Sequence, residues 1–414
     1  MARRAVILIE GASNMPLFVG AARRLGLTPI TLSANPARYD YLAVEDFQVI
    51  RVNTSDLDAL IRECCRIGQT YDIAGITSAM ELTYAMVGKL CLHFNLPGPN
   101  PASIERCCDK FAQRHLLTQA GVPTPAYRLA TDATEIESAA AEIGLPVVVK
   151  PAAGTGSMGV RLCRSVDELA EHTTYLLAEK HVWWSSPRIL VEEFAQGQHY
   201  SVDIMGNDVF GIAAADFGRP PHFVCHEYIY PAVLTDSEYR RIADVSRSCL
   251  KALDLGWGPT NIDFRWTDVG PVVIEVNPRL AGTPIPQLGQ LAYGVDLAAE
   301  HIKLVIGDEW NLCRRHSHSA AARILLPDRD GILDWITGDC QAAIVPGVAE
   351  VKLYIEPKTP IVRGGDYRDK IGHVLAASPN PLRTRAILRH AVDLIDWAIS
   401  PFPTLEGGLP DARP

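Results

Sequence analysis

The sequence predicts a mixed fold, with an α/β N-terminal part and an α+β architecture beyond it. Strand-like and helix-like segments alternate through the first hundred residues, at 5–10, 17–25, 29–32, 57–67 and 73–78. A glycine-rich loop at 154–159 separates two strand-like segments, and turn residues at 267–271 separate two more. Alternating strands and helices are typical of a parallel sheet covered on both faces, whereas short turns join antiparallel strands.

One acidic residue of the N-terminal part follows a strand of this parallel sheet. Glu81 comes shortly after the strand expected at 73–78, and open α/β sheets bind ligands outside the carboxyl ends of their strands. A glutamate in the first turn of a helix also favours the helix dipole. A substrate contact and a helix-terminal charge therefore both remain open for Glu81.

The glycine-rich loop predicts a phosphate site at the tip of a hairpin. Residues 145–164 read Leu-Pro-Val-Val-Val-Lys-Pro-Ala-Ala-Gly-Thr-Gly-Ser-Met-Gly-Val-Arg-Leu-Cys-Arg. The dinucleotide-binding form of G-x-G-x-x-G opens a helix, but here helical periodicity begins only near Val166. We expect backbone N–H groups of the loop to close over phosphates, with Lys150 supplying a positive charge. An ordinary glycine-rich turn is the alternative.

Two other phosphate-binding architectures do not fit the sequence. Asp216-Phe217-Gly218 matches the D-F-G motif of protein kinases. A kinase places its strand lysine after the glycine loop, whereas Lys150 precedes the loop, and the sequence contains no H-R-D. A P-loop is excluded because G-x-x-x-x-G-K-[ST] is absent from the sequence.

A second predicted hairpin carries candidate metal ligands. Residues 272–276 are apolar and β-branched, so they read as a buried strand that folds back on the strand before the turn. A hairpin centred on Val269 places Asp263 opposite Glu275. Opposed like charges on a buried strand pair need a neutralising partner, and Mg²⁺ takes oxygen ligands. A solvated polar hairpin face is the alternative.

Strand alternation extends this site by two residues. Asn277 and Arg279 share the face of Glu275. The pattern therefore presents carboxylates and an amide for a metal, followed by a guanidinium for phosphate.

In their order along the chain, these parts resemble the ATP-grasp superfamily from about Lys110 to Arg279. Lys110 opens the helix-like Lys-Phe-Ala-Gln-Arg-His-Leu-Leu and resembles the first ATP-contacting lysine of the family. Lys150 resembles the second lysine, and the loop residues Gly154, Gly156, Ser157, Met158 and Gly159 resemble the phosphate loop.

The resemblance also implies the remaining ATP and metal contacts. Ile189-Leu-Val-Glu192-Glu193-Phe194-Ala195 resembles the strand that passes adenine, where a carboxylate and backbone groups contact the base. Asp263, Glu275 and Asn277 resemble the Mg²⁺ ligands, and Arg279 resembles the catalytic arginine that holds the transferred phosphate. Many relatives have a ribose-binding glutamate where this sequence has His199. A ribose contact and an ordinary strand residue both remain open for His199.

Within the superfamily, the layout resembles carboxylate–amine ligases, the L-amino-acid ligases or dipeptide synthetases. Residues 274–283, which include Gly282 and Thr283, favour that group. A loop before Pro231 often contributes to the acceptor site of such ligases, so His226, Glu227 and Tyr228 are substrate candidates beside Glu81 and Arg279.

The resemblance implies a five-part organisation. We expect an N-terminal Rossmann-like α/β domain at 1–105 and a linker helix at 106–126. A mobile glycine-flap lid follows at 127–196, then a catalytic subdomain at 197–320 and a C-terminal sheet subdomain at 321–414. Within the last part, we expect strands around 346–355, a helix at 382–399 and a loose tail at 401–414.

The implied reaction joins a small carboxylate to an amine, with ATP and Mg²⁺ as cofactors and Mn²⁺ as an alternative metal. The γ-phosphoryl group of ATP passes to the carboxylate, and an amine then displaces phosphate from the acyl phosphate. Two other functions remain open: a biotin-carboxylase-like or purine-pathway enzyme, and a non-catalytic ATP-binding regulator.

Composition limits the partners. A net charge of −9 argues against a nucleic-acid surface. The apolar stretches are too short to span a membrane, and the N-terminus does not read as a signal peptide. We therefore expect a cytoplasmic protein whose 10 cysteines are thiols, with a homodimer as an open possibility.

Overall fold

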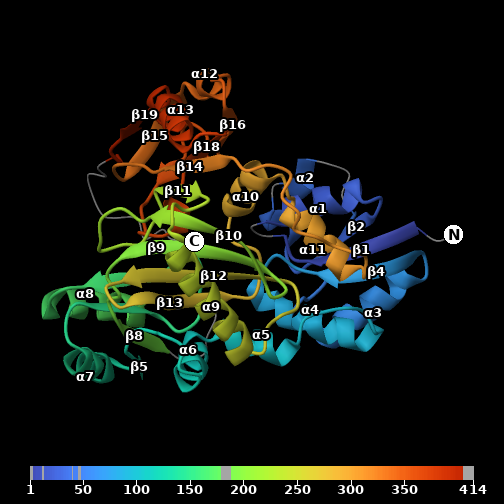
Figure 1. The fold of residues 1–414 in the computed structure, drawn as a ribbon, viewed down its shortest axis with the longest axis horizontal. Helices are drawn as coiled ribbons and strands as arrows, with labels where there is room; N and C mark the ends of the chain where they lie inside the picture. The colour runs from blue at the N-terminus through green and yellow to red at the C-terminus, as the bar shows by residue number, and fades with distance from the viewer. Residues whose placement is uncertain (1–2, 12–13, 40, 45–47, 179–187, 404–414) are drawn as a thin grey trace.

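The computed structural model describes residues 3–11, 14–39, 41–44, 48–178 and 188–403. It confirms the expected fold class, with one parallel sheet at the N-terminus and antiparallel sheets elsewhere. Figure 1 shows the N-terminal sheet to the right of a large central sheet, with a lid below it and the C-terminal strands above it. No helix among the described residues is long and apolar enough to cross a bilayer.

The N-terminal sheet has the strand order β3-β2-β1-β4, and its strands are parallel. Alternate residues of β1 face two separate cores, because Val6 and Leu8 pack with α1 and α11 whereas Ala5 and Ile7 pack with α3 and α4. The elements are β1 (Arg3–Ile9), α1 (Met15–Arg24), β2 (Thr28–Ser33), η1 (Pro36–Arg38), α2 (Tyr41–Val44), β3 (Gln48–Arg51), α3 (Leu57–Gly68), β4 (Tyr71–Thr77) and α4 (Glu81–Phe94), with α11 (Leu297–Val305) added from the catalytic part.

Two short helices lead from this domain to the lid. They are α5 (Pro101–Cys108) and α6 (Lys110–Gln119). The Asp109 side chain accepts hydrogen bonds from the backbone N–H groups of Phe111 and Ala112, so the second helix begins at Lys110.

The lid is a small antiparallel sheet with the order β5-β8-β6-β7, and its core lies against two helices. The glycine loop joins β6 to β7, which are antiparallel, and this confirms the expected hairpin. The elements are β5 (Tyr127–Ala130), α7 (Ala133–Ile143), β6 (Val147–Pro151), β7 (Arg161–Cys163), α8 (Val166–Ala178) and β8 (Ile189–Glu193).

The central sheet has eight antiparallel strands in the order β13-β12-β9-β10-β11-β14-β18-β16. Three strands of the C-terminal part thus extend the sheet that carries the candidate metal ligands. The elements are β9 (Gln198–Met205), β10 (Asp208–Asp216), β11 (Glu227–Tyr230), α9 (Asp236–Ala252), β12 (Pro259–Thr267), β13 (Gly270–Asn277), α10 (Ile285–Tyr293), β14 (Ser319–Leu325), β16 (Val348–Leu353) and β18 (Gly372–Ser378).

A three-stranded sheet, β17-β15-β19, completes the C-terminal part. The helix expected at 382–399 is wrong beyond Asp393, because α13 ends there and residues 396–400 form a strand paired with β15. Trp397 and Ile399 pack into the core beside α13, so tertiary pairing outweighs the helical pattern. The tail at 404–414 lies outside the described residues. The elements are β15 (Gly331–Thr337), α12 (Asp339–Ala343), β17 (Pro360–Ile361), η2 (Tyr367–Asp369), α13 (Pro381–Asp393) and β19 (Asp396–Ser400).

Candidate active site

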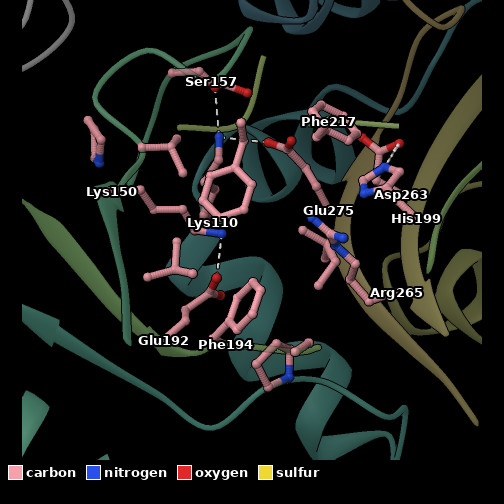
Figure 2. A pocket seen from close by; sticks show the side chains of 18 of the residues that line it. Lys110, Lys150, Ser157, Glu192, Phe194, His199, Phe217, Asp263, Arg265 and Glu275 are labelled. Carbon is pink, nitrogen blue, oxygen red and sulfur yellow. Dashed lines mark hydrogen bonds and ion pairs between the residues drawn. The ribbon is translucent and has the colours of Figure 1, made fainter. Parts of the chain in front are cut away.

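A pocket lies between the lid and the central sheet, and most of the predicted ATP and metal contacts line it. Figure 2 shows labelled side chains from both sheets turned toward its interior. The predicted site residues that line this pocket are Lys110, Lys150, Gly154, Gly156, Ser157, Met158, Glu192, Glu193, Phe194, Ala195, His199, Asp263 and Glu275. Lining residues that the sequence reasoning missed include Arg265, Phe217, Phe223 and Ile274.

The hairpin of β12 and β13 brings the two candidate metal carboxylates together. Asp263 is the register partner of Glu275, as expected, and Asn277 is paired with Asn261 in the next row of the same face. The register shifts between Asp263 and Phe264, so a bulge follows the carboxylate pair. Both carboxylate side chains are 24% exposed, which leaves their oxygens accessible from the pocket.

Lys110 neutralises one of these carboxylates. Its Nζ lies 2.7 Å from Glu275 Oε1 and donates to the carbonyl of Gly154 at 2.7 Å. Burial pushes the pKa of Glu275 upward, but the bonded ammonium outweighs burial and holds that pKa below its usual value. The same pairing raises the pKa of Lys110 against the opposing effect of burial. A charged pair therefore joins the linker helix to the candidate metal site.

The donor set fits a hard cation. Two carboxylates and an amide supply oxygen ligands, and Mg²⁺ completes its coordination with water and substrate phosphates. Among the described residues, no group of three or more His, Cys, Asp or Glu side chains is arranged to hold a metal. Asp263, Glu275 and Asn277 are the residues that could hold such a cation.

A buried ionic network joins the lid to helix α6, and the sequence analysis did not predict its central residue, Arg114. Arg114 is fully buried and its Nε donates to Glu192 Oε1 at 2.6 Å. The other oxygen of Glu192 is paired with Lys150. Burial is the largest influence on Lys150 and, with Arg114, lowers its pKa, whereas the two cations lower the pKa of Glu192 against its burial.

The Glu192 carboxylate is paired with two cations, Arg114 and Lys150, and its expected contact with adenine stays a prediction. Glu193, the neighbouring carboxylate, accepts from the backbone N–H of Ala126 at 3.2 Å. The spacing of Lys110 and Arg114, four residues apart on one helix, was a signal that both point toward one site.

His199 lies beside the carboxylate pair of Asp263 and Glu275. Its Nε2 is 3.3 Å from Asp263 Oδ1, and its ring centroid is 4.5 Å from that of Phe217. Arg265 lies across the strands from His199 and extends its guanidinium over Phe217 and Phe223, 6.0 and 5.9 Å from their ring centroids. The pocket therefore has a cationic and aromatic wall at its central-sheet side.

Arg279 and Glu81 meet across the boundary with the N-terminal domain. Arg279 Nε lies 3.1 Å from Glu81 Oε2, and Arg279 Nη2 lies 3.5 Å from Asn277 Oδ1. The Thr283 hydroxyl donates to Asn14 Oδ1 at 2.8 Å, and a Cβ added at Gly282 would meet open space. Arg279 therefore contacts both Glu81 and the candidate metal ligand Asn277, while Thr283 contacts Asn14 of the N-terminal part.

The three acceptor-loop candidates do not line this pocket. Glu227 pairs with Arg323 at 2.5 Å, and His226 is exposed, with its ring beside Gly218. Burial raises the pKa of Tyr228 far above its usual value. The sequence could not place these residues because their neighbours come from distant strands.

Comparisons with known proteins agree with this geometry. A family model described as "Carbamoyl-phosphate synthase L chain, ATP binding domain" matches residues 109–312, and one described as "L-amino acid ligase C-terminal domain 2" matches residues 323–400. The chain belongs to the ATP-grasp superfamily, in its carboxylate–amine ligase group. The expectation from the motifs is therefore confirmed at the level of the family.

Individual ATP-grasp relatives and structures show the extent of the similarity. The structure of L-amino acid ligase from Bacillus licheniformis has a TM-score of 0.81 at 20% identity, over 97% of this chain and 100% of that one. "Uncharacterized protein y4rH" of Sinorhizobium fredii is 59% identical over 404 residues, which are 97% of this chain and 84% of that protein. Human carnosine synthase 1 is 25% identical over 92% of this chain, but the chain spans only 49% of its length.

Proposed function

We propose that this protein is an ADP-forming ligase that uses ATP to join the carboxylate of one amino acid, or a similar small molecule, to the amine of another. The single observation that carries the proposal is the opposed pair Asp263 and Glu275, with Asn277 on the same strand face. This pair faces the glycine loop at 154–159, called the glycine flap below, and the side chains of Lys110 and Lys150. A protein that only binds ATP does not need Asp263, Glu275 and Asn277 together with Arg279, so this set favours a catalyst over a regulator. The names of the relatives, L-amino acid ligase and carnosine synthase, support the same chemistry.

In the first step, a carboxylate oxygen of the substrate attacks the γ-phosphorus, and the bond from that phosphorus to the β–γ bridging oxygen breaks. ADP leaves, and an acyl phosphate forms. Bound Mg²⁺, or Mn²⁺, would offset the charge on the phosphates during transfer. Asp263, Glu275 and Asn277 are the residues that would hold it, and Lys110 and Lys150 position the phosphates.

In the second step, the amine nitrogen attacks the acyl carbon, the carbon–oxygen bond to phosphate breaks, and the nitrogen loses a proton. Phosphate leaves and the amide remains. The flap over the pocket keeps water from the acyl phosphate. In this proposal, Arg279 holds the reacting carboxylate and then its phosphate through a two-pronged guanidinium contact.

The Glu81–Arg279 pair suggests how an amino acid is recognised. An amino-acid zwitterion offers a carboxylate to Arg279 and an ammonium to Glu81. Its two charges can therefore replace the ion pair that these residues form with each other. We also propose a cytoplasmic location, consistent with ten cysteines that are free thiols. The proposed partners are small carboxylates and amines.

A phosphate-release screen tests the reaction. Each of the twenty amino acids is paired with every other in the presence of ATP and Mg²⁺, and a bicarbonate arm is added. We expect ADP, phosphate and a condensation product of matching mass. AMP with pyrophosphate would contradict the mechanism, and phosphate release dependent on bicarbonate would favour a carboxylase-type activity.

A further inference from the structure

The glycine flap is held at two points by parts of the chain outside the lid. Lys110 Nζ donates to the carbonyl of Gly154 at 2.7 Å. The backbone N–H of Tyr367, in the C-terminal part, donates to the carbonyl of Gly156 at 3.0 Å. The second contact joins residues more than two hundred positions apart, and nothing in the ATP-binding motifs predicts it.

The ring of Tyr367 also packs directly against the flap. A Cβ added to Gly156 would lie 2.3 Å from Tyr367 Cδ1, and Gly156 has φ +66°, a conformation that favours glycine. Glycine is therefore required at 156 for two reasons, its backbone conformation and the ring above it. The flap and Tyr367 are shaped to each other.

The orientation of the Gly156 carbonyl matters for phosphate binding. In the part of the chain that the structure describes, the backbone N–H groups of Thr155, Gly156 and Ser157 donate to no protein acceptor, and all three residues line the pocket. Such free N–H groups are the donors that a phosphate needs. A carbonyl held by Tyr367 cannot turn toward the same phosphate and repel it.

The segment that carries Tyr367 is itself well supported. The Asp366 carboxylate accepts from the backbone N–H of Arg368 at 2.9 Å, and Asp369 accepts from the backbone N–H groups of Gly364 and Gly365. A Cβ at Gly365 would lie 2.3 Å from His222 Nδ1, in the loop that carries Phe217 and Phe223. This segment thus contacts the flap and the neighbouring pocket loop together.

We propose that Tyr367 is a positioning residue that holds the glycine flap over the nucleotide phosphates, through its backbone N–H and its ring. The proposal rests on the proposed function, since it assumes a nucleotide beneath the flap. It assigns the C-terminal part a direct effect on phosphate binding and on the exclusion of water from the acyl phosphate.

Three substitutions separate the two contacts. Tyr367→Phe keeps both the ring and the N–H. Tyr367→Ala keeps only the N–H, and Tyr367→Pro removes both. Proline is tolerated here because Tyr367 is the first residue of η2 and Asp366 is extended, with φ −139° and ψ −172°. Val362→Ala, at a 63% exposed position of the same C-terminal part, is the matched surface control.

Two measurements are made on the full chain. One is calorimetric titration with Mg²⁺ and a non-hydrolysable ATP analogue, and the other is the ratio of phosphate released to amide formed. Tyr367→Pro should weaken nucleotide binding by roughly tenfold, as the loss of one hydrogen bond and its packing implies, and should raise the ratio. Tyr367→Ala should fall between Tyr367→Pro and wild type, whereas Tyr367→Phe and Val362→Ala should match wild type.

The outcomes keep the two proposals apart. Unchanged affinity and unchanged ratio in Tyr367→Pro would overturn the role of Tyr367. A lower melting temperature without a change in either quantity would show a merely structural residue and overturn it as well. Wild type that binds the analogue but forms no amide would contradict the ligase proposal, while the affinity series still judges Tyr367. Wild type that binds no nucleotide would overturn both.

Discussion

At the scale of single residues, the candidate site is a balance of buried charges. Lys110 neutralises Glu275, and Arg114 and Lys150 together neutralise Glu192. Removing one member of such a pair leaves its partner buried and unpaired, which costs several kcal/mol by itself. Substitutions that keep the size of the side chain limit this loss of stability, and turnover and melting temperature are therefore measured together.

Glu275→Gln is the first such test. The amide keeps the size of the side chain and can still accept from Lys110, but it loses the charge that a divalent cation needs. We expect turnover to fall by roughly 10³-fold or more, together with a lower melting temperature, because buried Lys110 loses its counter-charge. Phosphate release and thermal unfolding are measured side by side. Near-normal turnover with a large loss of stability would assign Glu275 a structural role instead.

Arg279→Lys tests the two-pronged contact. Lysine keeps the charge but cannot hold two oxygens in the planar geometry of guanidinium. We expect nearly unchanged affinity for an ATP analogue, because Lys110, Lys150 and the flap remain, and a roughly 10²-fold lower rate of amide formation. Arg323→Lys, whose ion pair with Glu227 lies outside the pocket, is the matched control. Lost nucleotide affinity with normal turnover at saturating ATP would show that Arg279 serves only ATP binding.

At the scale of elements, short-range patterns predicted the hairpins well. Alternation and turn residues placed Asp263 opposite Glu275, and positive-φ glycines agree with the hairpin tip at 154–159. The bulge after Asp263 and the strand at 396–400 were not predictable in this way, since both depend on pairing with another strand. The local spacing of apolar residues indicates whether a segment is a helix or a strand, but tertiary contacts decide where an ambiguous helix or strand ends.

Asp203 on strand β9 makes the free energy of unfolding depend on pH. Asp203 lies in the row of Asn261 and Asn277, accepts from Tyr230 Oη at 3.2 Å, and is 2% exposed. Burial raises the pKa of Asp203 to about 7. The folded state therefore binds a proton that the unfolded state releases near its ordinary pKa, so this residue makes stability fall as pH rises from about 4 to about 7.

Asp203→Asn should remove that slope while keeping the hydrogen-bonding shape. Buried carboxylates with lowered pKa values, such as Glu10 and Glu192, have the opposite slope, so the quantity to compare is the difference between the two proteins. Denaturant unfolding of wild type and Asp203→Asn at several pH values measures it. We expect the difference in unfolding free energy to change between pH 4 and 7 and to level off above that range. A constant difference would contradict a protonated Asp203.

At the scale of the whole molecule, the candidate site is assembled from distant parts. Helix α4 of the N-terminal part supplies Glu81, the lid supplies the glycine loop, the central sheet supplies the candidate metal ligands, and the C-terminal part supplies Tyr367 (Figure 1). Sequence motifs identified the first three but could not pair Glu81 with Arg279, because the two are 198 positions apart. Likewise, the spacing of Arg114 from Lys110 indicates a shared helix face, but it does not identify Glu192 as the partner of Arg114.

The contact between Glu81 and Arg279 yields a prediction about substrate class at this scale. If Glu81 receives the ammonium of an amino acid, Glu81→Gln should weaken discrimination against acids that lack an amine. We expect kcat/KM for the preferred amino acid to fall by roughly 10- to 100-fold, the range expected when a charged hydrogen bond is lost. The rate with the matching deamino acid, such as propionate for alanine, should change little. Phosphate release with both acids, at a fixed acceptor amine and saturating ATP, measures this ratio. Equal losses for both acids would mean that Glu81 orients Arg279 without contacting the ammonium, whereas unchanged rates for both would place the substrate elsewhere.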